Sequence, residues 1–295
     1  MRGARTPRWP TCWGSPRRPR IRSSYRDDNH EPELVCALTP FDALCGLRPV
    51  ADIVGLLAEL SGPELGGPAE VLARSGSPEG FRALLTTVLT APEPAALVAA
   101  VVIGCRTHAD GGSRFAPAYR EAPGLAERFL GDPGVVVSLL LNRVHLRPGE
   151  AMYVPPGRLH AYLSGLAVEV MACSDNVLRG GLTPKHVGVA ELLSVAELVS
   201  AAADTVTPAG GPGGWAGYAV PVPDFALARA EPAGAPVPSR PGGPQILLCT
   251  DGEFRLGDGR TILPLARGES AFVPLGPGVE IAGAGVVYRA TTTLP

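Results

Sequence analysis

The 295-residue sequence predicts a mainly β protein with a helical subdomain, built around two small antiparallel barrels of the jelly-roll type. Three observations lead to this fold class: a turn motif rich in Gly and Pro at 149–160, a second copy of its turn residues at 268–279, and apolar residues at helical spacing over 49–130. Glycine and proline shape the turns between short antiparallel strands, and such strands build the double sheet of a jelly roll.

The first motif, G-E-A-M-Y-V-P-P-G-R-L-H, has the spacing G-x5-P-x-G-x2-H from Gly149 to His160. This spacing resembles the second signature of the cupin barrel, in which the last position aims an imidazole into the barrel, where it can bind a metal. The alternative is a chance turn with a surface histidine, because the chain contains 37 Gly and 32 Pro.

The second copy, G-E-S-A-F-V-P-L-G-P-G-V at 268–279, keeps the turn residues and loses the histidine. Its Gly268 lies 119 positions after Gly149, and Val279 stands where the first copy has His160. An internal repeat at a fixed distance predicts a duplicated unit. We therefore expect double cupin-like (jelly-roll) barrels, the first of the metal-binding type and the second without a metal ligand.

The N-terminal 48 residues divide into two parts. Residues 1–26 hold eight Arg and no acidic residue, in no periodic pattern, which predicts a disordered basic tail; an arm that binds nucleic acid is the alternative. Residues 34–47 are largely apolar and predict one or two short buried strands around the break at Thr39-Pro40. Residues 27–48 are therefore assigned to the first barrel.

Residues 49–130 have helical spacing with Pro-Gly linkers between the segments, and they predict a helical subdomain. Strands are then predicted in V-V-V-S-L-L-L-N at 135–142, in E-A-M-Y-V-P and in H-A-Y-L-S-G-L-A-V-E-V-M, so that 131–190 returns to the first barrel.

Beyond residue 190 the sequence predicts a connection and then the second barrel. A helix at 190–202, followed by a stretch rich in Pro and Gly, makes 191–243 a helix and linker. Strands resume in 244–295 with a hairpin turn at Asp258-Gly259, and this segment is assigned to the C-terminal cupin-like barrel.

Composition excludes several classes of partner. The net charge of -2 gives no reason to expect nucleic acid, and no run of 18 apolar residues predicts a membrane span. The basic N-terminus lacks the apolar region of a secretory signal. Six scattered cysteines without a C-x-x-C pair predict free, mostly buried thiols in a reducing compartment, so we expect a cytoplasmic protein.

Three runs of sequence are similar to type I mannose-6-phosphate isomerases, also called phosphomannose isomerases. These runs are D-D-N-H-E-P-E-L, P-G-E-A-M-Y-V-P-P-G-R-L-H-A-Y-L and V-E-V-M-A-C-S-D-N-V-L-R-G-G-L-T-P-K, and the resemblance extends over about residues 25–295. It implies a monomeric zinc enzyme that interconverts mannose 6-phosphate and fructose 6-phosphate, with a hexose 6-phosphate as its small-molecule substrate.

The resemblance also implies roles for individual residues. Glu33 and His160 match zinc ligands, and Arg179 matches the catalytic arginine. Tyr162, Asp175 and Lys185, the sole lysine of the chain, match positions that line the sugar-phosphate pocket. Aldose–ketose isomerisation proceeds through an enediol and needs an acid/base group and a cation for the developing oxyanion, which suits these residue types.

The sequence departs from the family pattern in two places. The family takes two further zinc ligands from a Gln-x-His segment, whereas the only Gln here is Gln245. We therefore expect an N-terminally truncated first barrel with an incomplete zinc site. The remaining histidines are not expected to replace the missing zinc ligands, and His145 is expected to be structural. The Lys of the family's N-H-K-P-E segment is Glu31 here, and an anion at this position should weaken binding of a phosphosugar.

Two alternatives remain open on the sequence. The first is a non-catalytic double-cupin protein that binds a sugar phosphate or a protein partner. The second, another cupin metal enzyme such as an oxygenase, fits less well because the run S-D-N-V-L-R-G-G-L-T-P-K closely matches the isomerase family.

Overall fold

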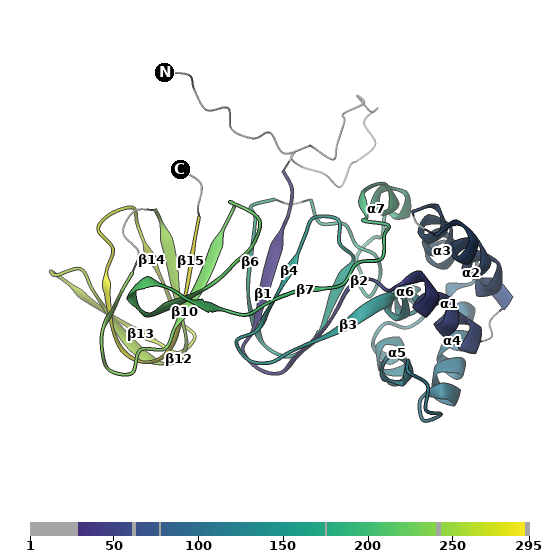
Figure 1. Cartoon of the computed structure of the whole chain (residues 1–295), viewed down its shortest axis with the longest axis horizontal. Coiled ribbons are helices and arrows are strands. Elements are labelled where there is room, and N and C mark those ends of the chain that lie inside the picture. The colour runs from purple at the N-terminus through teal and green to yellow at the C-terminus, as the bar shows by residue number, and fades with distance from the viewer. Residues whose placement is uncertain (1–28, 61–62, 77, 175, 240–242, 293–295) are drawn as a thin grey trace, which may run out of the picture.

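The computed structural model describes residues 29–60, 63–76, 78–174, 176–239 and 243–292. The predicted basic tail at 1–26 and Asp175 lie outside these residues. Three units succeed one another along the long axis (Figure 1): a second β unit, a first β unit and a helical unit. The predicted class, mainly β with a helical part, is confirmed.

The first β unit consists of two antiparallel sheets. One has the strand order β6-β1-β4-β7 and the other β3-β2-β5. Apolar side chains from both sheets pack together in one cluster, which includes Val35, Phe41 and Met152. The strands have the bounds β1 Glu33–Ala37, β2 Phe41–Leu47, β3 Leu141–Leu146, β4 Ala151–Val154, β5 His160–Ser164, β6 Ala167–Met171 and β7 Asp204–Val206. The prediction of one or two short buried strands around Thr39-Pro40 is therefore confirmed, and the structure has two.

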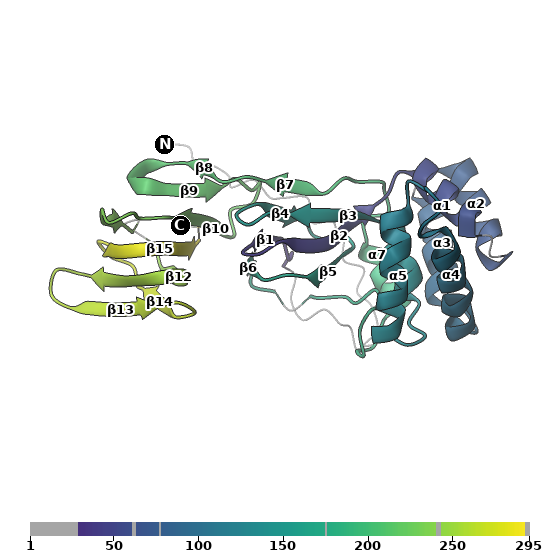
Figure 2. The ribbon, with the colours of Figure 1, turned by 90° about the horizontal axis from the view of Figure 1, so that it is seen from below.

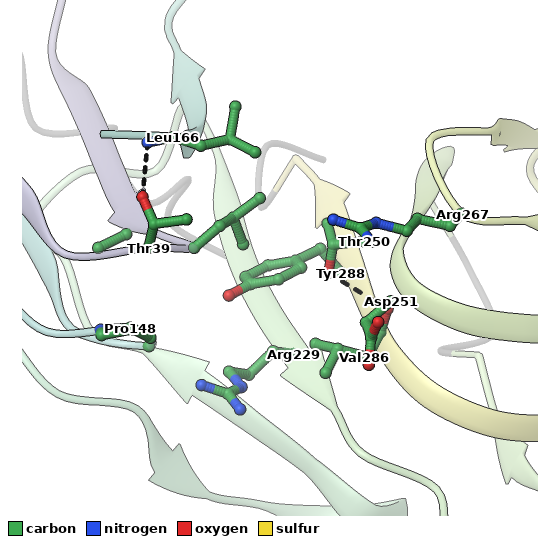
Figure 3. A pocket seen from close by; sticks show the side chains of 12 residues that line it. Thr39, Pro148, Leu166, Arg229, Thr250, Asp251, Arg267, Val286 and Tyr288 are labelled. Carbon is green, nitrogen blue, oxygen red and sulfur yellow. Dashed lines mark hydrogen bonds between the residues drawn. The ribbon is translucent and has the colours of Figure 1, made fainter. Parts of the chain in front are cut away.

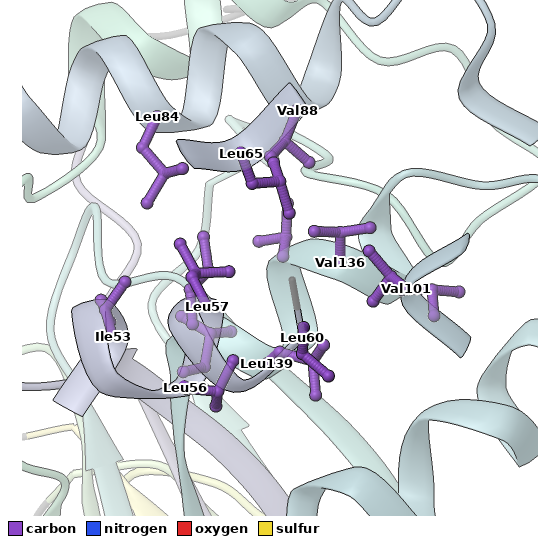
Figure 4. Close-up of a cluster of buried hydrophobic side chains, with 14 of the residues drawn as sticks. Ile53, Leu56, Leu57, Leu60, Leu65, Leu84, Val88, Val101, Val136 and Leu139 are labelled. Carbon is purple, nitrogen blue, oxygen red and sulfur yellow. The ribbon is translucent and has the colours of Figure 1, made fainter. Parts of the chain in front are cut away.

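The helical unit lies between β2 and β3 in the chain and covers one end of the first β unit (Figure 2). In α1, Ile53, Leu56, Leu57 and Leu60 are buried, which is the i, i+3, i+4, i+7 spacing of one helix face. These side chains meet those of the other helices in a shared core (Figure 4). The helices are α1 Val50–Leu60, α2 Pro63–Ser75, α3 Glu79–Leu89, α4 Pro94–His108, α5 Ala116–Arg128 and α6 Gly134–Leu140.

Helix α6 corrects one prediction, because residues 135–142 were expected to form a strand. The first six of them lie in α6, and the last two begin β3. All seven residues of α6 are buried, and most of them belong to the core of the helical unit. A short run that is apolar on every side has no periodicity to separate helix from strand. The local signal is Asp132-Pro133: Asp132 Oδ1 accepts a hydrogen bond from the Gly134 amide at 2.7 Å, and proline is favoured where a helix begins.

The second β unit is an antiparallel sheet with the order β13-β12-β15-β10-β9-β8; β11 pairs with β15, and β14 with β12. Asp258 closes the predicted hairpin by accepting hydrogen bonds from the amides of Arg260 and Thr261. The strands are β8 Ala209–Gly210, β9 Trp215–Tyr218, β10 Ala226–Ala230, β11 Val237–Pro238, β12 Gln245–Gly257, β13 Ile262–Ala266, β14 Ser270–Val273 and β15 Glu280–Thr291.

The segment 191–243 differs from its prediction as helix and linker. The helix α7 is shorter than the predicted 190–202, spanning Val189–Val195, because Ala196 is already extended. Strands β7 to β11 also lie in this segment, and β10 pairs with β15 along five residues. The partner of β10 is distant in the sequence, so the Pro- and Gly-rich composition gave no sign of a long ladder.

The repeated motif builds the same turn twice. In the first copy Glu150 Oε2 accepts a hydrogen bond from the Arg147 amide at 2.8 Å, and in the second Glu269 Oε2 accepts one from the Ala266 amide at 2.7 Å. The glycine before each glutamate also makes a matching contact. The Gly149 amide donates to the Ala37 carbonyl and the Gly268 amide donates to the Cys249 carbonyl, both at 2.8 Å. The sequence repeat is therefore also a repeat of hydrogen bonding.

We expected Val279, the apolar residue at the position of His160, to be buried, and the structure meets this only in part. Val279 packs against the core of the second β unit but is only half-buried. The Val279 amide donates a hydrogen bond to the Ser239 hydroxyl at 2.8 Å, and the Val279 carbonyl accepts one from the Ser239 amide. Val279 therefore serves mainly to hold the Ser239 segment.

The repeat allows a graded test of turn strain with three glycine-to-alanine variants. Gly149 has φ +88° and adjoins the Arg229 guanidinium, Gly268 has φ +86° in open space, and Gly276 has neither constraint. We expect Gly276→Ala to change the free energy of unfolding by less than about 0.5 kcal/mol, and Gly268→Ala to cost about 1 kcal/mol. Gly149→Ala should cost more than Gly268→Ala, because both strain and steric conflict act. Urea denaturation measures all three, and equal losses would contradict this account.

The two β units meet through the outer face of the sheet that contains β1. Leu34 and Cys36 of β1 pack against Tyr218 and Tyr288 of the second unit. The Cys36 thiol lies 3.0 Å from the Tyr218 hydroxyl, which donates to Gly149 O at 2.9 Å. Alternation along β1 therefore sends even-numbered side chains to this interface and odd-numbered ones, including Glu33, to the other face.

The cysteines in the described part of the chain are all free, as predicted; four are buried and Cys173 is exposed. No single helix in those residues has the length and apolarity to cross a membrane, although α3 and α4, bent by 109° at their junction, would pass that criterion as a pair.

Candidate functional site

The candidate site lies where the two sheets of the first β unit face each other. Glu33 begins β1 and His160 begins β5, and the tertiary fold brings Glu33 Oε2 to 3.3 Å from His160 Nε2. Their side chains are 11% and 26% exposed, so the pair is accessible from one side. The two zinc ligands inferred from the resemblance are therefore direct neighbours.

Tyr162 and Glu169 complete a cluster of four polar groups. The Tyr162 hydroxyl donates to Glu33 Oε2 at 3.1 Å, and the ring packs at 5.5 Å from both His160 and Phe41. Glu169 lies on β6 opposite Val35 of β1, on the same face as Glu33, and it interacts with both Tyr162 and Glu33. The cluster thus joins residues from both sheets.

The electrostatics of the cluster are dominated by close pairs. Burial acts to raise the pKa of Glu33, but the hydrogen bond and positive charge of His160 outweigh it and lower that pKa. Burial acts to lower the pKa of His160, but Glu33 outweighs it and raises that pKa. Burial and the negative charge of Glu33 raise the pKa of Glu169. The carboxyl group of Glu169 therefore holds a proton more readily than an ordinary glutamate does.

The turn before His160 is held from two sides. Gly157 has φ +80°, and a Cβ there would lie 2.8 Å from Val195 O, so this position requires glycine. Arg158, whose side chain is 9% exposed, forms ion pairs with Glu197 and, at 3.8 Å, with Asp204. The Arg158 carbonyl accepts from His160 Nδ1 at 3.0 Å, which directs Nε2 towards Glu33.

The loop after β6 carries the remaining predicted site residues. Arg179 and Lys185 are both exposed, and no hydrogen bond or ion pair joins either side chain to the cluster within the residues described here. Asp132 anchors the loop by accepting from the Thr183 amide at 3.1 Å. The structure therefore brings Glu33, His160 and Tyr162 together and leaves the two cations available to solvent. Asp175, the other residue predicted here, is outside the described residues.

The described residues bring together two of the zinc donors that the resemblance implies. Structural and catalytic zinc ions need three or four protein ligands. In the described ranges no group of three or more His, Cys, Asp or Glu side chains has an arrangement that fits a metal. Glu33 and His160 supply two donors, and these are engaged with each other. The expectation of an incomplete zinc site therefore stays a prediction, and it rests on the number of available donors.

Two features of the site were missed by the sequence reasoning. Glu169 carried no local signal, because a charged residue at an alternate position of the strand A-V-E-V-M is what a solvent-exposed position would also show. The interaction of His30 carried none either: its Nε2 lies 3.1 Å from Asp224 Oδ2 of the second β unit, a partner 194 residues away. His30 therefore does not contribute to the cluster. His145 pairs with Asp42 at 3.0 Å on the surface.

Comparison with known proteins gives consistent matches. A model of the phosphomannose isomerase type I catalytic domain matches residues 17–50. The mannose-6-phosphate isomerase of Escherichia coli is 33% identical over 269 residues, covering 90% of this chain and 67% of that protein. The Salmonella typhimurium enzyme is 34% identical over 251 residues, covering 85% and 63%. The human enzyme is 31% identical over 280 residues, covering 87% and 66%.

A solved structure agrees with these relatives. The crystal structure of a mutant phosphomannose isomerase from Salmonella typhimurium superimposes with a TM-score of 0.81 and 32% sequence identity, covering 92% of this chain and 68% of that one. The chain thus spans about two thirds of the length of the proteins that it matches, and 63% of the Salmonella relative.

Proposed function

Because this chain belongs to the type I phosphomannose isomerase family, we propose that it carries an aldose–ketose isomerase site for mannose 6-phosphate and fructose 6-phosphate. The observation that carries the proposal is the cluster of Glu33, His160, Tyr162 and Glu169, which gathers proton donors and acceptors on one accessible face. The relatives are mannose-6-phosphate isomerases by their printed names, and their alignments cover 85% and 90% of this chain.

In this proposal each residue has a separate task. Glu169, an exposed carboxyl group with a raised pKa, moves the proton between C1 and C2. Arg179 stabilises the negative charge that develops on the enediol oxygen, and Lys185 holds the phosphate as a compact cation. Tyr162 fixes the orientation of Glu33 through its hydroxyl. Asp175 is assigned to the sugar pocket on the resemblance alone.

We further propose that the two β units are cupin-like barrels, the first of metal type and the second without a metal ligand. The matching turns at Glu150 and Glu269 support a duplicated unit. The half-buried Val279 at the position of His160 supports the loss of the ligand in the second copy. Zinc, when bound, would polarise the sugar oxygens; Glu33 and His160 are the only members of its proposed ligand set that the described residues offer.

A second function, binding of a sugar phosphate without turnover, is favoured by the number of zinc donors. The described residues supply only two donors for zinc, which is fewer than a catalytic zinc site needs. An assay that couples fructose 6-phosphate formation to a reporter enzyme, run beside calorimetric binding of mannose 6-phosphate, separates the two. Turnover supports the isomerase, binding alone supports the second function, and the absence of both contradicts each.

A smaller prediction concerns the Tyr162 hydroxyl. Tyr162→Phe keeps the ring contacts with His160 and Phe41 and removes the hydrogen bond to Glu33. We expect turnover with excess zinc to fall about tenfold, the effect of one hydrogen bond to a charged group. Tyr153→Phe, a change at the buried interface of the β units, is the control and should leave turnover unchanged. Equal losses in both variants would show that the effect is structural.

A further inference from the structure

A cavity lies between the two β units, on the side of β1 away from the candidate site. Its volume is about 290 Å³, which is close to the lower limit of small-molecule sites. One wall comes from the turns of the first β unit at Thr39, Pro148 and Leu166, and the other from the second β unit. The walls of the cavity therefore come from segments that are far apart in the sequence.

Two guanidinium groups reach this cavity. Figure 3 shows Arg229, Arg267 and Tyr288 directed from the second β unit towards the turns that carry Thr39, Leu166 and Pro148. Arg229 is mostly buried, with its side chain 20% exposed, and forms an ion pair with Glu231. Arg267 is exposed and makes no ion pair among the residues described. One carboxylate cannot use all the donors of these two groups, so several N–H groups are available to a ligand.

Hydroxyl and carboxylate groups lie beside the arginines. Asp251 lines the cavity and is exposed, and the Thr250 hydroxyl is held by the Val286 carbonyl at 3.3 Å. The buried Tyr288 forms part of the floor, and its hydroxyl lies 3.4 Å from the Cys36 thiol. Guanidinium groups bind phosphate through paired hydrogen bonds, whereas a carboxylate accepts hydrogen bonds from sugar or polyol hydroxyls.

We propose that this cavity binds the phosphate ester of a small polyol, with the phosphate on Arg229 and Arg267 and a hydroxyl on Asp251. The ligand bridges the two β units, because the arginines belong to one and the turns around Thr39 and Pro148 to the other. Its site is distinct from the Glu33 cluster, since β1 presents alternate side chains to opposite faces. The proposal does not depend on isomerase activity.

The test is an amide-resolved NMR titration of the full chain with glycerol 3-phosphate, and a parallel one with inorganic phosphate. We expect saturable shifts at the amides of Thr39, Thr250 and Asp251, and tighter binding of glycerol 3-phosphate than of phosphate. Arg267→Ala should weaken binding about fivefold or more at these amides, the effect of one charge-assisted contact. Because Arg267 is exposed, this variant should fold normally.

Arg255→Ala is the matched control. Arg255 is an exposed arginine of β12 outside the cavity lining, so its loss should leave the titration unchanged. Equal weakening by Arg255→Ala and Arg267→Ala would overturn the proposal, because it would indicate non-specific attraction. The absence of a saturable shift at the three amides would also overturn the proposal. Equal affinity for glycerol 3-phosphate and inorganic phosphate would contradict the proposed contact between Asp251 and a polyol hydroxyl.

Discussion

We expect the purified chain to hold far less than one zinc ion per molecule when it is dialysed against a chelator of moderate strength. Glu33 and His160 are two donors where zinc needs three or four, and the sequence has no Gln-x-His segment. Complete structural zinc sites bind with about 10–16 kcal/mol, so half of such a ligand set corresponds to a Kd near micromolar or weaker. Metal analysis and competition with a chromogenic chelator measure the stoichiometry and the Kd.

The control for zinc is the double variant Glu33→Gln, His160→Gln. If the pair alone is a weak site, the double variant should hold almost as little zinc as the parent chain after dialysis. The Escherichia coli relative, treated in the same way, provides the reference for a member of the matched family. One tightly held zinc per molecule in the parent chain, lost in the double variant, would contradict the expectation and require further ligands.

Arg179→Ala is expected to lower turnover about 100-fold or more, measured with excess zinc in the coupled assay. Arg179 is an exposed cation on the loop between β6 and α7, and its proposed task is to stabilise charge that exists only in the transition state. Loss of one such stabilising group costs about 10²–10³ in turnover in other enzymes. The KM should change far less than kcat, because the ground state of the sugar carries no such charge.

Two further variants separate this role from a structural one. Arg179→Lys keeps the charge without the forked donor geometry, and we expect it to recover part of the lost turnover. Arg255→Ala, which removes an exposed arginine of the second β unit, should leave turnover unchanged. Near-normal turnover in Arg179→Ala would refute the assignment of Arg179.

Much of the fold could be predicted because its elements have strong local patterns. The buried face of α1 repeats at helical spacing, and the turn glycines at 149 and 268 mark the same device in both β units. The pairing of Glu33 with His160 could also be anticipated, but only through a family resemblance, since 127 positions separate the two residues in the sequence.

Elsewhere the local sequence pattern gave a wrong prediction or none. The run at 134–140 is apolar at nearly every position and became helix α6 because the helical core surrounds it. Strand β10, in a stretch predicted as linker, exists because β15 provides its partner. Glu169 was passed over because its importance comes from Glu33 and Tyr162, which lie on other strands.

The sequence by itself determined the periodic helices, the turn positions and the internal repeat, and its resemblance to a family predicted the two zinc-type donors. Only the tertiary structure decided which strands join the eight-stranded sheet, that Glu169 completes the polar cluster, and that His30 pairs with Asp224 instead. The physical reason is the range of the interactions. Helix faces and tight turns are set by residues a few positions apart, whereas strand pairing and side-chain clusters depend on contacts that the folded chain alone brings together.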